Sequence, residues 1–472
     1  MIIRDRAYMD EQGNPSDKML KSCIKEHQKQ LDRWNKLNNY FIGKHVILDR
    51  KMKSEFTPNN RIVCNHARII TVTASSHMVG RPVKYTVDEA AESAFQPIQE
   101  AYDHQNISAI DSELEQDCSV FGKAVELDYM STDDDPVPVA VQLDPRNAFV
   151  VHDDTVEHKR MLAVHYFKVK DEEGKDDGYK ITVYTASKIS KYKTEGDDID
   201  GEWTKDGEEE QHYFGDVPMF EYRNNEEEQG DFEGVISLID AYNLLQSDRV
   251  NDKEAFVDAI LVIKGQSFGD DFDETSDTMK YLREHRLLEL DKDSEASYLT
   301  KQLVEADADI LSRTLSEDIH RFSMVPNIAD QNFAGNSSGV AMGFKLLLLS
   351  ELTSLKERYF EAGLYERMKL FSNIFKIKRE ALDVNKVDVV FTHSLPVNQA
   401  EIAGIVAQLA GIVPDELLYG LLWFIPDPAK ALEMMKQQKE EQAVKAREMF
   451  GGGLPEDQEK LNAENEENEA EA

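Results

Sequence analysis

Residues 332–375 are the stretch that most constrains what this chain can fold into. A short polar loop, GNSSG at residues 335–339, runs directly into a long segment without proline. An apolar residue recurs there at helical spacing, at Phe344, Leu348, Leu352, Leu355 and Tyr359. An unbroken helix over residues 338–375 is roughly 57 Å long at 1.5 Å per residue. Such a helix is typical of a mechanical part in a larger assembly, or of a helix that crosses one large domain.

The leucine run at residues 346–349 is apolar on nearly every side of the predicted helix. Its flanks turn polar at once, at Lys345, Ser350 and Glu351. We therefore expect burial of the run on two sides, by its own lobe and by a neighbouring subunit. Burial within a single protomer is the alternative.

The chain is strongly acidic. Its 91 Asp and Glu residues outnumber its 54 Lys and Arg residues, which gives a formal net charge of -37. Nucleic-acid binders attract phosphates with Lys and Arg, so this chain repels DNA except where basic residues are locally concentrated. A repelling surface suits a wall past which DNA slides, although acidity also serves solubility alone.

Several classes of protein are excluded by what the sequence lacks. No apolar run approaches the roughly 18 residues of a membrane span, and the N-terminus has no signal-peptide core. We therefore expect synthesis in a cytosol and no membrane partner. Cys23, Cys64 and Cys118 are too few and too widely spaced for a disulfide framework or a zinc site.

No catalytic motif stands out. The sequence contains no GxxxxGK[ST], GxSxG, HExxH or CxxC pattern. Acidic clusters at residues 133–135, 208–210 and 270–274 are candidates for divalent cations, but solvated loops explain them more simply. We predict no catalytic residue, no cofactor and no metal.

The periodicity of the first half changes from helical to β. Helical spacing is predicted over residues 15–40, with Gly43 at the end, and again within residues 59–85 before a strand. Short β-branched runs over residues 119–187 predict antiparallel strands. Residues 194–231 are crowded with Asp, Glu and Gly, so we expect an exposed hairpin and linker there.

The second half is mainly helical. Helices are predicted at residues 235–260 and 305–322, and these two can lie side by side. Between them we expect a strand at 260–265, a helix at 278–284, and a strand pair near 286–290 and 296–299. Beyond residue 375 follow a strand at 386–393, helices over 400–449 broken by prolines, and a disordered acidic tail.

Several segments, in the same order, resemble the portal proteins of tailed double-stranded-DNA bacteriophages, in the branch with a wing, stem, clip and crown. The resemblance covers roughly residues 38–440. It is carried by NNYFIGKHVILDR, PNNRIVCNHARIITVTASSHMVGRPVKY, SVFGKAVELDYM, LDPRNAFVVHDD, SLIDAYNLLQSDRVNDKEAFVDAILVIKG, ASYLTKQL and GNSSGVAMGFKLLLLSELTSLKERYFEAGL.

The resemblance implies an α+β fold that is mainly helical, with an antiparallel β-rich wing. By position, the implied parts are a wing at residues 1–234, a stem helix at 235–259, a clip at 260–302, a second stem helix at 303–326, a tunnel loop at 327–338, the long helix and return strand of the wing at 339–397, a crown at 398–450 and a disordered tail at 451–472.

The resemblance also places candidate site residues. The tunnel-loop candidates for the DNA channel are Gln331, Asn332, Gly335, Asn336, Ser337, Ser338 and Gly339. The stem candidates that would face the channel are Arg249, Lys253, Arg313 and Arg321. The clip candidates for terminase docking are Asp270, Asp271, Asp273, Glu274 and Arg283.

Two features limit how tightly these candidates would hold DNA. Some portals place lysines in or near the tunnel loop, but none lies between Asn327 and Gly339 here, so passing hydrogen bonds are expected in place of a tight grip. The basic stem residues could instead pair at helical spacing with acidic residues of the stem, namely Asp248, Asp252 and Glu317.

The implied assembly is a homo-oligomeric ring at one capsid vertex of the virion, made in the bacterial host cytoplasm. It has about twelve subunits, or about thirteen in isolation. Double-stranded DNA passes through the ring, and the implied protein partners are the terminase large subunit, a head-tail adaptor, and the major capsid and scaffolding proteins. Two other classes fit the residues alone: a metal-dependent nuclease that uses the acidic clusters, and an acidic DNA mimic or adaptor.

Overall fold

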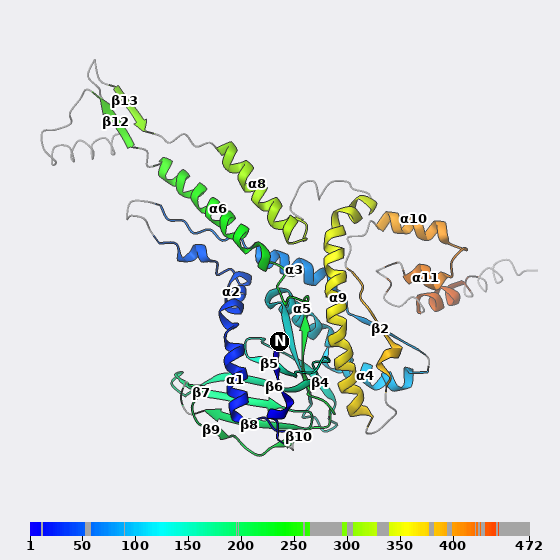
Figure 1. The fold of residues 1–472 in the computed structure, drawn as a ribbon. Helices are drawn as coiled ribbons and strands as arrows, with labels where there is room; N and C mark the ends of the chain where they lie inside the picture. The colour runs from blue at the N-terminus through cyan, green and yellow to red at the C-terminus, as the bar shows by residue number, and fades with distance from the viewer. Residues whose placement is uncertain are drawn as a thin grey trace, which may run out of the picture. The chain divides into compact units, whose positions relative to one another are not determined.

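The structure mixes helices and sheets, in agreement with the predicted α+β class (Figure 1). The computed structural model describes residues 1–10, 13–51, 58–88, 90–194, 196, 198–257, 260–264, 295–299, 305–327, 339–376, 382–393, 399–420, 422, 425, 430–439 and 442. The chain divides into two compact units. The first comprises Met1–Gly335 and Phe344–Ser394, and the second comprises Asn336–Gly343 and Leu395–Ala472.

The helical segment predicted over residues 15–40 is confirmed, and it consists of two helices, α1 (Asp17–Gln28) and α2 (Leu31–Phe41). The break lets the two helices bury different faces: α1 packs on the largest sheet, and α2 packs against other helices of the unit. Ser16 caps α1 by accepting a hydrogen bond from a backbone N–H. Gly43 follows α2 with a φ of 86°, as expected for a glycine that ends a helix.

The largest sheet has the strand order β1-β5-β6-β7-β8-β10, with β9 paired to β8. Its strands are β1 (Ile2–Arg4), β5 (Ala148–Asp153), β6 (Arg160–Lys170), β7 (Asp176–Tyr184), β8 (Lys188–Thr194), β9 (Trp203–Lys205) and β10 (Glu210–Gln211). Neighbouring strands are antiparallel except for β1 and β5, which are parallel. Leu20 and Ile24 of α1 pack on this sheet against Phe149, Leu162 and Val164.

A second sheet has the order β11-β3-β4, with β3 (Lys123–Met130), β4 (Pro138–Leu143) and β11 (Met219–Arg223). The antiparallel strands predicted after residue 119 are therefore confirmed from Lys123 onward. The exposed linker predicted over residues 194–231 is wrong around β11, because Phe220 and Tyr222 are buried in the core. A short apolar run was hidden there by the acidic residues on either side of it.

The helices next to these sheets are α3 (His66–Val79), α4 (Glu92–Gln105) and α5 (Ile107–Phe121). The helix followed by a strand predicted within residues 59–85 is confirmed as α3 and β2 (Lys84–Val87). β2 pairs with β14 (Val387–Val390), which is the strand predicted at residues 386–393. No sequence pattern identified α4 or α5. The described part of the first unit also contains four 3-10 helices, at Arg6–Tyr8, Val46–Asp49, Glu233–Val235 and Val384–Lys386.

Four further elements lie within residues 235–326, for which the resemblance implies a stem and a clip. They are α6 (Ile236–Val257), β12 (Ile260–Lys264), β13 (Glu295–Leu299) and α8 (Glu305–Phe322). The helix predicted at residues 305–322 is confirmed at both ends. β13 pairs with β12, whereas the predicted pairing joined it to a strand near residues 286–290, which lie outside the described residues together with the helix predicted at 278–284.

The long helix is confirmed as α9 (Gly339–Phe375), which has 37 residues and is therefore about 56 Å long. In the second unit, α10 (Gln399–Leu409) and α11 (Asp415–Gly420) follow the prediction of helices interrupted by proline, with Pro414 between them. The tail predicted to be disordered lies outside the described residues.

Candidate functional site

α6 and α8 lie side by side and run in opposite directions (Figure 1). Gln246 donates through Nε2 to Ser312 Oγ at 2.7 Å, and the ion pair between Arg249 and Asp309 measures 3.8 Å. Residue numbers fall along α8 as they rise along α6, which is the register of an antiparallel pair. The prediction that the two helices can lie side by side is confirmed.

The arginines among the basic stem candidates form ion pairs. Arg249 and Arg313 both contact Asp309, at 3.8 and 3.2 Å, and Arg321 lies 3.5 Å from Asp318. Pairing is therefore observed for these three, although the acidic partners differ from those expected. Partly exposed pairs of this kind stabilise a fold by at most about 1 kcal/mol, so their main effect is to neutralise local charge.

The fourth basic stem candidate, Lys253, is exposed on α6. Asp248, which was expected to pair within the stem, instead forms an ion pair of 2.7 Å with Arg50, in the segment that precedes α3.

A ladder of polar side chains joins α6 to the extended segment before α3. One residue per helical turn accepts a hydrogen bond from the backbone N–H of every second residue of that segment. The three pairs are Asn243 with Cys64 at 2.8 Å, Ser247 with Ile62 at 3.0 Å and Asn251 with Asn60 at 2.7 Å. Four helical residues rise about 6 Å and two extended residues span about 6.6 Å, so the two spacings match.

α9 is attached to the rest of the first unit by buried charges. Arg367 is fully buried and donates to Glu126 on β3 and to Asp111 on α5. The two carboxylates raise the pKa of Arg367 against the opposing effect of burial. Burial raises the pKa of Asp128, and the neighbouring carboxylate of Glu126 raises it further.

A second buried cation lies three turns earlier on α9. Lys356 donates through Nζ to Asp231 at 2.6 Å and lies 2.6 Å from Glu115. Burial lowers the pKa of Lys356, but the two carboxylates outweigh it and leave the pKa raised. Burial raises the pKa of Glu115 to about 7. Asp231 belongs to the segment predicted to be an exposed linker, and its burial corrects that prediction.

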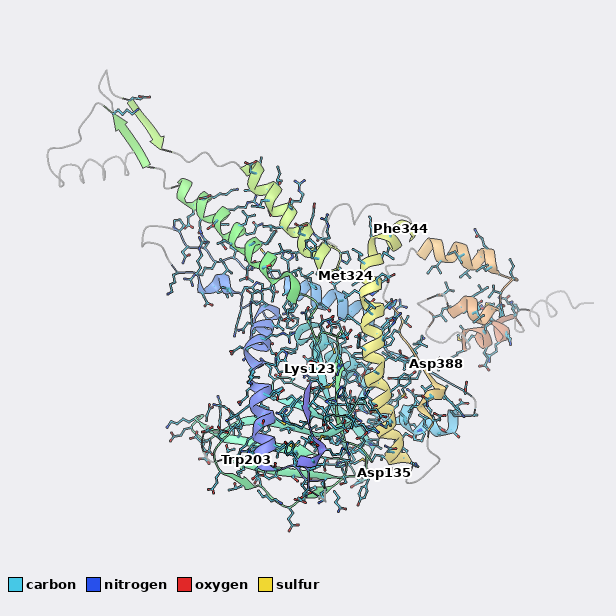
Figure 2. The ribbon with its side chains drawn as sticks, viewed as in Figure 1. Lys123, Asp135, Trp203, Met324, Phe344 and Asp388 are labelled. Carbon is cyan, nitrogen blue, oxygen red and sulfur yellow. The ribbon has the colours of Figure 1, made fainter. Side chains whose placement is uncertain are left out.

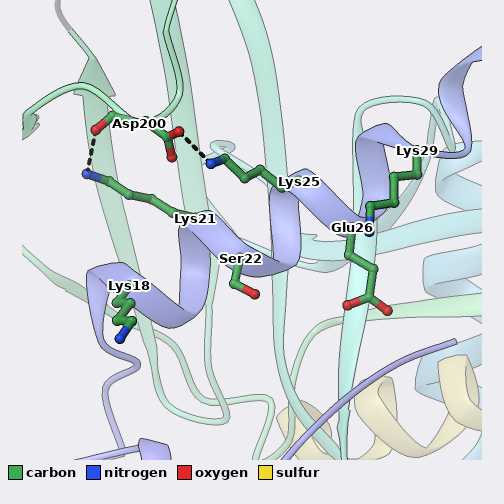
Figure 3. Close-up of a pocket in the computed structure, with 7 residues that line it drawn as sticks. All are labelled: Lys18, Lys21, Ser22, Lys25, Glu26, Lys29 and Asp200. Carbon is green, nitrogen blue, oxygen red and sulfur yellow. Dashed lines mark hydrogen bonds and ion pairs between the residues drawn. The ribbon is translucent and has the colours of Figure 1, made fainter.

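The groove along α1 has a volume of about 650 Å³ and concentrates lysines (Figure 3). It is lined by Lys18, Lys21, Ser22, Lys25, Glu26, Lys29 and Asp200. Lys21 donates to the backbone oxygens of Asp200 and Gly201, and Lys25 forms an ion pair with Asp200 at 2.5 Å. The chain's own acidic loop thus neutralises part of this basic surface, which argues against a nucleic-acid site on α1.

Most candidates of the predicted tunnel loop and clip lie outside the described residues. This applies to Gln331, Asn332, Gly335, Asn336, Ser337 and Ser338, and to Asp270, Asp271, Asp273, Glu274 and Arg283. Gly339 is described as the first residue of α9.

The family described as phage portal protein, SPP1 Gp6-like, matches residues 20–445, which is most of the chain. The chain belongs to this phage portal protein family. The portal protein of Bacillus phage SPP1 is 22% identical to it over 464 residues, which cover 91% of this chain and 88% of that protein. The match confirms the predicted resemblance.

A phage portal protein is a structural, non-enzymatic component of the virion capsid, so the hypotheses of a nuclease and of a DNA mimic are set aside. Among the described residues, no group of three or more His, Cys, Asp or Glu side chains is arranged to hold a metal ion. In the acidic cluster at residues 208–210, Glu209 pairs with Lys188 and Lys205, and Glu210 pairs with Lys191. No helix in the described part of this portal protein is long and apolar enough to cross a membrane.

The buried ions of this portal protein escaped the sequence analysis, although a signal for them existed. Lys356 and Arg367 are eleven positions apart, which is about three helical turns, and they share a face with Phe360, Leu364 and Phe371. Charged residues within an apolar face indicate buried acidic partners. The sequence alone does not say which of the many carboxylates those partners are.

Proposed function

We propose that this phage portal protein forms a closed ring of about twelve copies at one capsid vertex, through which double-stranded DNA is packaged and ejected. α6 and α8 are assigned to the stem, residues 260–302 to the clip and residues 327–338 to the tunnel loop. Residues 1–234 and 339–397 form the wing, residues 398–450 the crown and residues 451–472 a tail. The single observation that carries this assignment is the antiparallel α6–α8 pair, which continues into the paired strands β12 and β13.

The proposed clip docks the terminase large subunit through Asp270, Asp271, Asp273, Glu274 and Arg283. A head-tail adaptor and the major capsid and scaffolding proteins complete the set of proposed protein partners. The tunnel-loop candidates contact DNA transiently by hydrogen bonds, because no lysine lies between Asn327 and Gly339.

The charge of the chain supports a channel that lets DNA slide. Each copy carries a formal net charge of -37, and a ring multiplies that charge by the number of copies. Proteins grip DNA by releasing counterions from phosphates with Lys and Arg. Arg249, Arg313 and Arg321 already have carboxylate partners, so they offer DNA less net positive charge than free cations would.

Native mass spectrometry and negative-stain imaging of the purified chain test the ring. Closed rings of about a dozen subunits are expected, and monomers at all concentrations would contradict the proposal. Bulkier residues at the loop glycines, in Gly335→Val and Gly339→Val, are expected to reduce DNA packaging more than ring assembly. Equal loss of both would give the loop a purely structural role. Deletion from Gly453 onward is the control that should leave the rings intact.

A further inference from the structure

An apolar stripe runs along the outer face of α9. We define it by Phe344, Leu347, Leu348 and Leu355. Leu347 and Leu348 follow Phe344 by three and four positions, and Leu355 follows Leu348 by seven, so all four lie on one side of the helix. Phe344 is 74% exposed, Leu348 50% and Leu355 54%. Figure 2 labels Phe344 near the beginning of α9. Exposed large apolar side chains that gather on one side of a helix indicate an interaction surface.

The opposite face of α9 is the one that its own core holds. Thr353 Oγ1 lies 3.2 Å from Nδ1 of the buried His77, and Lys356 and Arg367 enter the buried ion clusters described above. Leu346 and Leu349 are buried on this side. The leucine run therefore has one face inside the subunit and another outside it. α9 cannot rotate to bury the stripe without breaking several buried ion pairs.

We propose that the apolar stripe is covered by a second copy of this chain, as part of the contact between neighbouring subunits of the ring. The inference rests on the proposed ring and deepens it by naming a contact surface. Two copies with a net charge of -37 each repel one another, so contact costs least where the surface is locally neutral. The exposed positions on this face include Glu351 and Arg358, whose charges cancel.

Ring geometry adds a second requirement. Subunits in a closed ring with more than two members meet through two different surfaces, so the stripe must face a different patch of the next copy. Such patches exist on the described helices: Ile69 and Val72 are exposed on α3, and Ile310 and Leu311 are exposed on α8. The chain thus carries apolar surface of its own that can complement the stripe.

The test introduces a charge into the stripe and compares it with a matched substitution elsewhere. Leu348→Glu and Leu355→Glu are expected to raise the concentration needed for ring assembly at least about thirtyfold, as loss of an interface hot spot does. Val156→Glu is the control, because Val156 is 98% exposed in the loop between β5 and β6 and lies outside the stripe. Circular dichroism and thermal unfolding check that each variant is folded.

The inference is supported if the wild type and Val156→Glu form rings while the stripe variants are folded but monomeric. Rings from the wild type and from the stripe variants alike would overturn the inference and leave the proposed ring standing. A wild type that forms no rings would overturn both.

A labelling experiment keeps the inference testable if a glutamate variant fails to fold. Leu355→Cys, in a Cys64→Ser background, should react with a maleimide in the monomer and be protected at least about tenfold in the ring, since burial in an interface excludes the reagent. Val156→Cys should react equally in both. The natural Cys23 and Cys118 are buried. Equal reaction of Leu355→Cys in both forms, or protection already in the monomer, would overturn the inference.

Discussion

Arg367 binds Glu126 through two parallel hydrogen bonds, from Nε to Oε1 at 2.7 Å and from Nη2 to Oε2 at 2.5 Å, although the residues are 241 positions apart. A third hydrogen bond joins Arg367 Nη1 to Asp111 Oδ1 at 2.7 Å. Through this one side chain α9, β3 and α5 are joined inside the first unit. These three hydrogen bonds hold the part of α9 around Arg367 against β3 and α5.

Replacing Arg367 by Met should be severely destabilising, because it leaves two carboxylates buried without their cation. We expect a loss of about 3–5 kcal/mol in the free energy of unfolding, measured by urea denaturation at pH 7. Arg313→Met is the control, because its pair with Asp309 is exposed, and it should change the free energy by less than about 1 kcal/mol. Adding Glu126→Gln and Asp111→Asn to Arg367→Met should recover part of the loss. Equal losses in the free energy of unfolding for Arg367→Met and Arg313→Met would contradict the role of Arg367 as the buried partner of the two carboxylates.

Substitution by alanine at two glycines of α9 should change the stability of the chain in opposite directions. A Cβ at Gly363 would lie 2.2 Å from Tyr222 Cε1, whereas a Cβ at Gly343 meets no heavy atom of the described residues within 4 Å. Gly363→Ala should therefore destabilise the chain by about 1–3 kcal/mol through overpacking. Gly343→Ala should stabilise it by up to about 1 kcal/mol, because alanine is the better helix former. Thermal unfolding of the monomer distinguishes the two, and a stabilising Gly363→Ala would refute the close packing of α9 on β11.

The polar ladder predicts a local effect. Asn243→Ala removes the acceptor for the Cys64 N–H and the partner of His45. It should therefore lower the free energy of unfolding by about 1–3 kcal/mol. Hydrogen exchange of the Cys64 amide should become faster, while exchange in the large sheet stays unchanged. Ser237→Ala, at an exposed position of the same helix, should leave exchange at Cys64 as it is. Faster exchange in both variants would show that the ladder does not protect this segment.

The elements that were predictable are the long, periodic ones. α8 and α9 follow the predicted bounds because helical spacing of apolar residues continues over many turns without proline. Amino-acid composition predicted the structure of residues 194–231 less well. The acidic residues between 194 and 231 suggested a solvated linker, yet β11 pairs with β3 in the second sheet and Asp231 is buried. An average over a long window hides a strand of five residues.

The contacts of the buried polar residues could not be predicted from the sequence. Helical spacing places Asn243, Ser247 and Asn251 on one face of α6, but a polar face is ordinarily solvated. Only the structure brings residues 60–64 alongside α6. Likewise, the stem arginines were expected to pair with Asp248, Asp252 and Glu317, whereas Asp309 on α8 pairs with Arg249 of the facing helix α6 and with Arg313 of its own helix. Contacts between segments far apart in sequence are not encoded in local periodicity.

His27 is buried, with Nε2 2.9 Å from the Pro145 oxygen and Nδ1 2.9 Å from the Tyr166 hydroxyl. A carbonyl can only accept, so Nε2 carries the proton and Nδ1 accepts from Tyr166. Burial, with the positive charge of Lys123, lowers the pKa of His27 from 6.5 to about 3.

This lowered pKa gives His27 a defined effect on stability. Between pH 6.5 and 3 the unfolded chain binds a proton at His27 that the folded chain does not, so falling pH favours unfolding by up to about 1.4 kcal/mol per pH unit from this residue. His27→Gln removes the titration. The stability advantage of the wild type over this variant, measured by urea denaturation, should therefore be constant above pH 6.5 and shrink steadily below it. His104→Gln, at an exposed position on α4, is the control and should show no such trend. A wild-type advantage that stays constant from pH 7 to 4 would mean that His27 is protonated equally in the folded and unfolded chains, which its buried contact with the Tyr166 hydroxyl argues against.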